Sequence, residues 1–72
     1  MITLEQAKSL SYGTILYHKK QGKIRRWKVN GKVKTWKTRP NEVKIPVKYG
    51  LYSYDFVTET ELNVVCLNEE DV

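Results

Sequence analysis

The sequence predicts a small, mainly β domain in which five short strands curl into a barrel. Short runs of alternating apolar and polar residues recur along the chain, separated by Gly, Pro and Asn, as in all-β domains. Residues 3–6, TLEQ, have the pattern of a helix capping box and predict one short helix before the strands. A chain of 72 residues makes one domain, residues 1–72, and is too short for a two-sheet sandwich.

The predicted helix covers residues 3–9 and is expected to close one open end of the sheet. Thr3 can cap its first turn, and Gln6 can reach back to the Thr3 backbone. The first strand follows at residues 14–19, with apolar side chains on both sides, as is typical of an interior or strongly curved strand. His18, the lone histidine, is expected to add to the polar surface at the end of this strand.

Residues 23–39 predict a β-hairpin around Asn30-Gly31, because two alternating runs flank that dipeptide. A two-residue turn at Asn30-Gly31 would mix apolar and charged side chains on each face. A three-residue loop with Gly31 in the left-handed region pairs Trp27 with Val33 and separates the two kinds of side chain. We therefore prefer the three-residue loop.

In this register one face of the hairpin is basic. Lys28 would lie opposite Lys32, and Arg26 opposite Lys34. Like charges directly opposite one another destabilise a sheet, so a protein that keeps them is expected to bind an anion there. The basic face would carry Arg26, Lys28, Lys32, Lys34 and Trp36, while Trp27, Val33 and Thr35 face the core.

The next segments predict a loop and two strands. Residues 38–42 form a polar loop in which proline fixes the turn. Residues 43–48, VKIPVK, alternate cleanly, with valine and isoleucine toward the core and lysine toward water. Pro46 cannot donate to a ladder, so this strand has an unpaired side there. Gly50 predicts a bulge or bend that lets the sheet curl.

The last third of the chain predicts an aromatic strand, one helical turn and a closing strand. Tyr52, Tyr54 and Phe56 stand at alternate positions and form either a core stripe or a row of partly exposed stacking aromatics. Thr58 is expected to cap one helical turn over residues 58–62. Residues 63–67 form the last strand, and residues 68–72 an acidic tail that is expected to fray.

The predicted core includes Trp27, Val33, Ile45 and Val47. Cys66 is the lone cysteine and lies in an apolar run, so it is expected to be a buried, reduced thiol, in agreement with a cytoplasmic setting. The N-terminus has no apolar signal region, and no run approaches the ~20 apolar residues that a membrane span needs. We therefore expect no membrane partner.

The charge is strongly polarised along the chain. Residues 18–48 contain twelve of the thirteen Lys and Arg residues and a single acid, Glu42, so this segment has a net charge of +11 and the remainder −6. A basic half beside an acidic half is typical of proteins that bind nucleic acid or another polyanion. The competing interpretation is a surface that is charged for solubility only.

The leading hypothesis is non-enzymatic binding of nucleic acid, either DNA or RNA. Basic side chains would neutralise phosphates, and Trp36 would stack on a base. The predicted nucleic-acid-binding residues are Arg25, Arg26, Lys28, Lys32, Lys34, Trp36, Lys37 and Arg39. We expect no catalytic residue, metal site or cofactor, because the chain has neither a glycine-rich phosphate loop nor a metal-ligand motif.

The alternative hypothesis is a protein-interaction module. An acidic host protein would be attracted by the same basic face. An aromatic groove of Tyr49, Tyr52 and Tyr54 would instead accept a proline-rich peptide.

The order of elements, with one helical turn between a bent strand and the last strand, is that of an SH3-like barrel; an OB-like barrel usually needs a longer chain. Two segments, RRWKVNGKVKTWKTRP and VKIPVKYGLYSYDF, resemble small uncharacterised proteins of tailed bacteriophages and prophages. The resemblance covers nearly the whole chain and includes SYGTILYHKK and the closing NVVCL. It implies a phage or prophage source and an SH3-like barrel, and it implies no activity.

Overall fold

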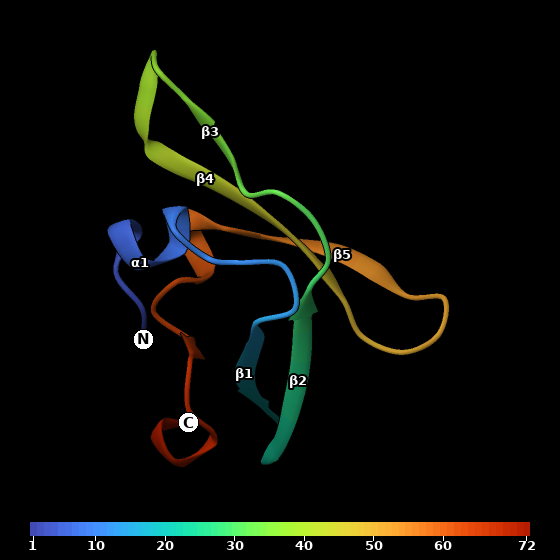
Figure 1. Ribbon diagram of the computed structural model, residues 1–72. Helices are drawn as coiled ribbons and strands as arrows, with labels where there is room; N and C mark the ends of the chain where they lie inside the picture. The colour runs from blue at the N-terminus through green and yellow to red at the C-terminus, as the bar shows by residue number, and fades with distance from the viewer.

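The computed structural model describes residues 1–72, with the exception of the Lys20 side chain. Strands prevail, and the prediction of a mainly β fold with one short helix is confirmed (Figure 1). The elements are α1 (Leu4–Lys8), β1 (Ile15–Lys20), β2 (Lys23–Val29), β3 (Lys34–Trp36), β4 (Arg39–Lys48), β5 (Tyr54–Thr58), the 3₁₀ turn η1 (Glu59–Glu61), β6 (Val65–Cys66) and the 3₁₀ turn η2 (Glu69–Asp71).

The strands form one antiparallel sheet in which β4 is central. β2 and β3 pair with β4, β5 also pairs with β4, and the sheet continues from β2 through β1 to β6. The predicted barrel is closed and has five strands, whereas the described backbone forms six strands. Within this backbone, neither β3 nor β5 pairs with β6, so the two ends of the sheet do not meet. The sheet is therefore open, because β6 contains two residues and reaches only β1.

The predicted hairpin around Asn30-Gly31 is wrong. β2 and β3 are not paired with each other anywhere in the described backbone; they lie one after the other along β4. Val29 at the end of β2 faces Val47, and Lys34 at the start of β3 faces Lys44. β2 and β3 are thus two halves of one interrupted strand, and the chain runs straight on where the sequence predicts a reversal.

Pro46 gives the physical reason for this interruption. Its carbonyl accepts the Asn30 N–H at 2.9 Å, so the edge of β4 at Pro46 faces residues 30–33. Proline has no N–H, so it cannot donate the second hydrogen bond that would continue the ladder at this point. Gly31 packs directly on the proline, because a Cβ at position 31 would lie 3.1 Å from Pro46 Cγ. Gly31 lacks the left-handed backbone that the predicted loop requires, so it serves close packing and not a turn.

The turns that do reverse the chain lie elsewhere. Gln21 and Gly22 have φ values of 53° and 78° and connect β1 to β2, as in a two-residue type I′ hairpin. Trp36 pairs with Arg39 across the second turn, which connects β3 to β4. The loop predicted at residues 38–42 is therefore wrong in extent: β4 begins at Arg39, and a register shift leaves residues 40–42 as a bulge opposite β3.

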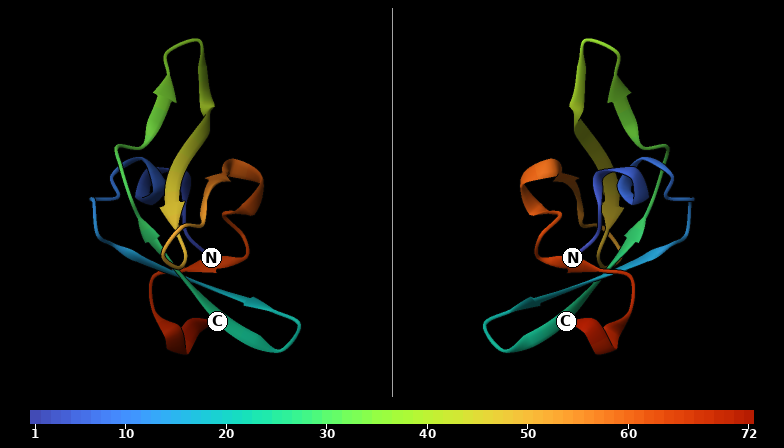
Figure 2. Two further views of the ribbon diagram at one scale, coloured as in Figure 1. Left: turned by 90° about the vertical axis from the view of Figure 1, so that its right-hand side faces the viewer. Right: turned by 90° about the vertical axis from the view of Figure 1, so that its left-hand side faces the viewer.

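Two of the three short helical elements, α1 and η1, lie where they were predicted. α1 begins after Thr3, whose Oγ1 accepts the Gln6 N–H at 3.1 Å while Gln6 Oε1 accepts the Thr3 N–H at 2.8 Å, a complete capping box. The helix buries Ala7 and lies over the inner side of β4 (Figure 2). One helical turn, η1, precedes β6, but Thr58 does not cap it with its side chain, because its hydroxyl is bonded to that of Thr60.

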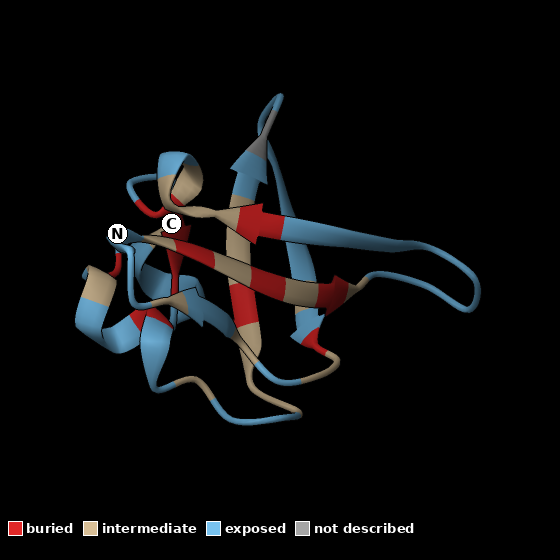
Figure 3. Cartoon of the chain, turned by 90° about the horizontal axis from the view of Figure 1, so that it is seen from above, coloured by how far each residue is buried: buried red, intermediate tan, exposed pale blue. Residues whose placement is uncertain are grey.

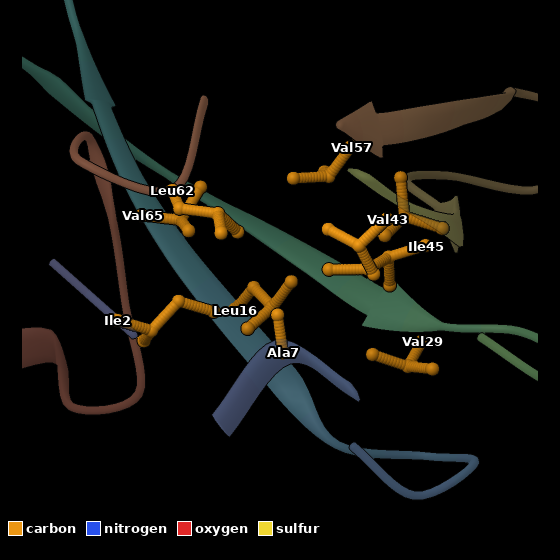
Figure 4. Close-up of a cluster of buried hydrophobic side chains, with 10 residues drawn as sticks. Ile2, Ala7, Leu16, Val29, Val43, Ile45, Val57, Leu62 and Val65 are labelled. Carbon is orange, nitrogen blue, oxygen red and sulfur yellow. The ribbon is translucent and has the colours of Figure 1, made fainter. Parts of the chain in front are cut away.

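The core lies on the inner side of the sheet, where side chains from β1, β2, β4, β5 and β6 meet Ala7 and Leu62 (Figure 4). Ile45 and Val47 are fully buried, as predicted, whereas Trp27 and Val33 are only partly buried at the edge of the core, so their predicted burial is wrong in degree. The buried apolar residues are Ile2, Ala7, Leu16, Val29, Val43, Ile45, Val47, Val57, Leu62, Val65 and Cys66.

The aromatic strand faces outward. Tyr52, Tyr54 and Phe56 are 90%, 59% and 42% exposed, so the core-stripe interpretation is wrong and the exposed alternative is correct. Val57 supplies the buried side chain of β5 instead. The acidic tail forms the short 3₁₀ turn η2, and the buried, free Cys66 donates from Sγ to the carbonyl of Asp71 at 3.2 Å.

Candidate nucleic-acid interface

The alternation along β4 defines an outer face of the sheet. Its valine and isoleucine side chains point into the core, so Lys44, Pro46 and Lys48 point the other way. Buried and partly buried residues alternate along this strand (Figure 3). Because residues directly opposite in an antiparallel pair share a face, the register then assigns side chains of β2, β3 and β5 to the outer face.

Two pairs of lysines lie directly opposite one another on the outer face. Lys48 of β4 is opposite Lys28 of β2, and Lys44 of β4 is opposite Lys34 of β3. We call these four residues the lysine quartet. Like charges at such positions destabilise a sheet. The ion pairs of the described side chains, Arg26–Glu69 and Arg39–Glu42, include no member of the quartet, so its repulsion is not neutralised by a neighbouring carboxylate.

Two exposed aromatic rings of β5 flank the quartet. Phe56 lies opposite Pro46, and Tyr54 opposite Lys48, so both rings stand on the outer face. Lys44 Nζ is 4.2 Å from the centroid of the Phe56 ring, and Lys48 Nζ is 5.7 Å from that of Tyr54. Such cation–π contacts hold the ammonium groups beside the rings. The outer face therefore combines unpaired cations with exposed aromatic surface.

Three of the predicted binding residues belong to this outer face. Lys28 and Lys34 are members of the quartet, and Arg26 follows on the same side of β2. Arg26 is not free, because its Nη2 lies 2.7 Å from Glu69 Oε1 in η2. Three members of the basic face predicted for the hairpin therefore share one side of the sheet, but Lys28 and Lys34 lie opposite lysines of β4 and not opposite residues across Asn30-Gly31.

The residues around β3 form a second, smaller group. Lys32 and Trp36 line a shallow hollow along β3 together with Lys34 of the quartet, and Lys37 lies in the turn that follows. Arg39 Cζ lies 4.7 Å from the centroid of the Trp36 ring, and Arg39 also pairs with Glu42 at 3.0 Å. Trp36 is partly buried, and the guanidinium occupies one side of its ring, so less of the ring is available for stacking than predicted.

Arg25 does not join either group. It lies opposite His18 of β1, on the side of the sheet that faces the core, and lines a pocket there. Strand alternation separates it from Arg26, its neighbour in sequence. The eight predicted residues are therefore not one surface.

The predicted set of binding residues lacks Lys44, Lys48, Tyr54 and Phe56, although Tyr54 and Phe56 were considered as exposed stacking aromatics. The alternation of VKIPVK already placed both lysines away from the core, but nothing local indicated which lysines stand opposite them. For β5, the alternating aromatic residues Tyr54 and Phe56 made the solvent-exposed side of the strand look apolar. A weaker signal pointed the other way. Thr58 is polar and lies on the same side of the strand as Tyr54 and Phe56, whereas the apolar Val57 lies on the opposite side.

The chain matches no protein-family model, no curated protein sequence and no solved structure. The site is therefore interpreted from its own chemistry. Among the described side chains, no three His, Cys, Asp or Glu residues are grouped so that they can hold a metal ion. Within the same part of the chain, no helix is long and apolar enough to cross a membrane.

Proposed function

We propose that the protein binds nucleic acid without catalysis, through the outer face of its sheet. The observation that carries the proposal is the opposition of Lys28 to Lys48 and of Lys34 to Lys44. Four ammonium groups held at sheet spacing without carboxylate partners among the described side chains are stabilised when an anion binds between them. A phosphate backbone supplies such anions at regular intervals.

The aromatic rings favour a single strand over a duplex. Phe56 and Tyr54 are exposed beside the quartet, and an unpaired base can stack on such a ring for about 1–3 kcal/mol. In a duplex the base faces are already stacked. We assign the stacking role to Phe56 and Tyr54 first, because both rings are exposed, and to Trp36 second, because it is partly buried. A cation lies beside each of the three rings, so exposure sets this order.

The test is a titration of a fluorescently labelled single-stranded DNA, its duplex and the corresponding RNA, each at 50 mM and at 200 mM salt. If each member of the quartet contacts one phosphate, the slope of log affinity against log salt is roughly −3 for a single strand, since each contact contributes about −0.7. Phe56→Leu is expected to weaken single-strand binding with little change in slope, because stacking releases few ions. Binding weaker than about 100 µM to all three at ~0.15 M salt, the non-specific regime, rejects the proposal.

The alternative is a module that binds an acidic host protein, and one observation favours it. Leu51 and Tyr52 are 79% and 90% exposed in the loop between β4 and β5, and exposed apolar side chains beside a charged face are common at protein interfaces. Leu51→Ser/Tyr52→Ser would abolish such binding in nuclease-treated extract and leave oligonucleotide affinity unchanged. The peptide groove is less well supported, because Tyr49 lines the pocket on the inner side and Tyr54 stands on the outer face.

Three finer assignments belong to the same proposal. We propose an SH3-like barrel in an open form, since five strands remain when β2 and β3 count as one interrupted strand and η1 precedes the last strand. A bacteriophage or prophage source is supported by the resemblance of RRWKVNGKVKTWKTRP to proteins of such origin. A cytoplasmic setting, in the host cell if the chain is phage-encoded, is supported by the free thiol of Cys66.

A further inference from the structure

A pocket opens on the inner side of the sheet, opposite the lysine quartet. It has a volume of about 530 Å³, within the usual range of ligand sites. β1 and β2 supply one wall, and the start of the β4–β5 loop, β5, η1 and Val64 supply the other. Its main lining residues are His18, Arg25, Trp27, Tyr49, Asp55 and Glu61.

One wall of the pocket is aromatic and already ordered. The rings of His18 and Trp27 are stacked, with centroids 4.8 Å apart and planes inclined by 17°. Tyr49 lines the same pocket and is 42% exposed. A third planar ring that packs against this wall gains contact without ordering a flexible side chain. The wall therefore fits a flat, aromatic ligand.

The polar groups of the pocket are not matched to one another. Arg25 only donates hydrogen bonds, and the Asp55 and Glu61 carboxylates only accept them, yet the described side chains form no ion pair between Arg25 and either acid. Asp55 Oδ1 accepts the Phe56 N–H at 2.7 Å, which leaves its second oxygen free. His18 Nδ1 is buried and has no hydrogen-bond partner among the described atoms. Arg25 and Asp55 are exposed to solvent, so the buried Nδ1 of His18 is the polar atom that lacks a partner, and a ligand in the pocket can hydrogen-bond to it and to the exposed groups of both charge signs.

We propose that this pocket binds a guanine base, presented as a nucleotide. Guanine accepts at O6 and N7, the edge that arginine reads in bidentate fashion. Its other edge carries N1–H and an amino group, which donate to carboxylates. Adenine has one amino group and no oxygen acceptor, so it cannot satisfy Arg25 and both acids together. Guanine alone among the common bases is a planar ring with an acceptor pair facing an arginine and adjacent donors facing acids.

This inference does not rest on the proposed polyanion binding, because the pocket and the quartet lie on opposite sides of the sheet. A free nucleotide can bind in the pocket even if no oligonucleotide binds to the outer face. Loss of the pocket ligand would leave the salt slope of oligonucleotide binding unchanged, so failures of the two proposals are distinguishable.

The test is a titration of GMP and of AMP, followed by the fluorescence of Trp27 in a Trp36→Phe background. GMP is expected to quench Trp27 saturably and to bind roughly 5- to 150-fold more tightly than AMP, the range that one bidentate pair supplies. Arg25→Gln is expected to remove this preference. Arg26→Gln is the matched control, because it removes the same charge one residue away on the outer face, and it is expected to leave the preference intact.

Isothermal titration calorimetry of the unsubstituted chain gives the same GMP-to-AMP comparison if Trp36→Phe perturbs folding. Equal affinities for GMP and AMP overturn the proposal, since they report stacking without edge recognition. Absence of saturable binding at about 10 mM GMP also overturns it. Tighter binding of N-acetylargininamide than of GMP identifies the pocket as a site for organic cations and overturns the guanine assignment.

Discussion

The two sides of β4 contrast within a single strand. Val43, Ile45 and Val47 point inward and are at most 1% exposed, at the centre of the core. Lys44 and Lys48 point outward, and each is opposed by another lysine. The inner side contributes most of the stability of the fold, whereas the outer side costs stability through repulsion. Residues that a fold keeps at a cost are explained by function, and this contrast supports the polyanion proposal.

The largest expected effect is on the inner side. Ile45→Ala removes a fully buried side chain from the centre of the sheet and is expected to lower the free energy of unfolding by roughly 2–5 kcal/mol. Val33→Ala is the comparison, because Val33 packs against the same core from a partly buried position and is expected to lose about 1 kcal/mol. Urea denaturation measures both. Equal losses would mean that β4 is not the centre of the core.

The second prediction compares two neighbours of β5. Val57→Ala is expected to lower the free energy of unfolding by roughly 1–3 kcal/mol, because Val57 is 1% exposed. Phe56→Ala removes a larger side chain but is expected to cost less than half as much, since the ring is exposed on the outer face. Thermal unfolding of the two variants reports the order. The reverse order would restore the aromatic core stripe.

The third and smallest effect has the opposite sign. Lys48→Glu converts the Lys28–Lys48 opposition into an attractive pair and is expected to raise the free energy of unfolding by about 0.2–1 kcal/mol. Lys19→Glu changes the net charge equally, but Lys19 faces Ile24, so it controls for general charge relief. A gain in Lys48→Glu that does not exceed that of Lys19→Glu would show that the opposition carries no cost.

Much of the fold could be predicted because its signals are local. The capping box of Thr3 and Gln6 needs only three residues of separation, and the alternation of VKIPVK sets its own inner and outer sides. The prediction failed in choosing which strands pair with each other. Asn30-Gly31 has the stronger hairpin composition, but β4 pairs with both flanking strands and holds the chain extended.

The candidate site was partly predicted for the same reason. Arg26, Lys28 and Lys34 share a side by alternation, which sequence can show. The opposition of Lys28 to Lys48 joins residues twenty positions apart, and it depends on the pairing of β2 with β4, which no local pattern indicates. Arg25 was misplaced because charge counting along the chain does not distinguish the two sides of a strand.

The central claim is that the lysine quartet is kept for a polyanion at a cost to stability. Two properties of Lys44→Gln/Lys48→Gln test it together: the free energy of unfolding and the salt slope of binding to a single strand. The control is Lys8→Gln/Lys19→Gln, which removes the same charge from α1 and from β1, where Lys19 lies opposite Ile24 and not opposite another lysine.

The most direct measurement is therefore the paired titration of the quartet variant and its control. We expect the variant to unfold at an equal or higher urea concentration than the unsubstituted chain, and its salt slope to become shallower by about 1.4, the value for two lost phosphate contacts. The control is expected to keep nearly the full slope. A quartet variant with an unchanged slope, or one that loses more than about 1 kcal/mol of stability, would contradict the claim.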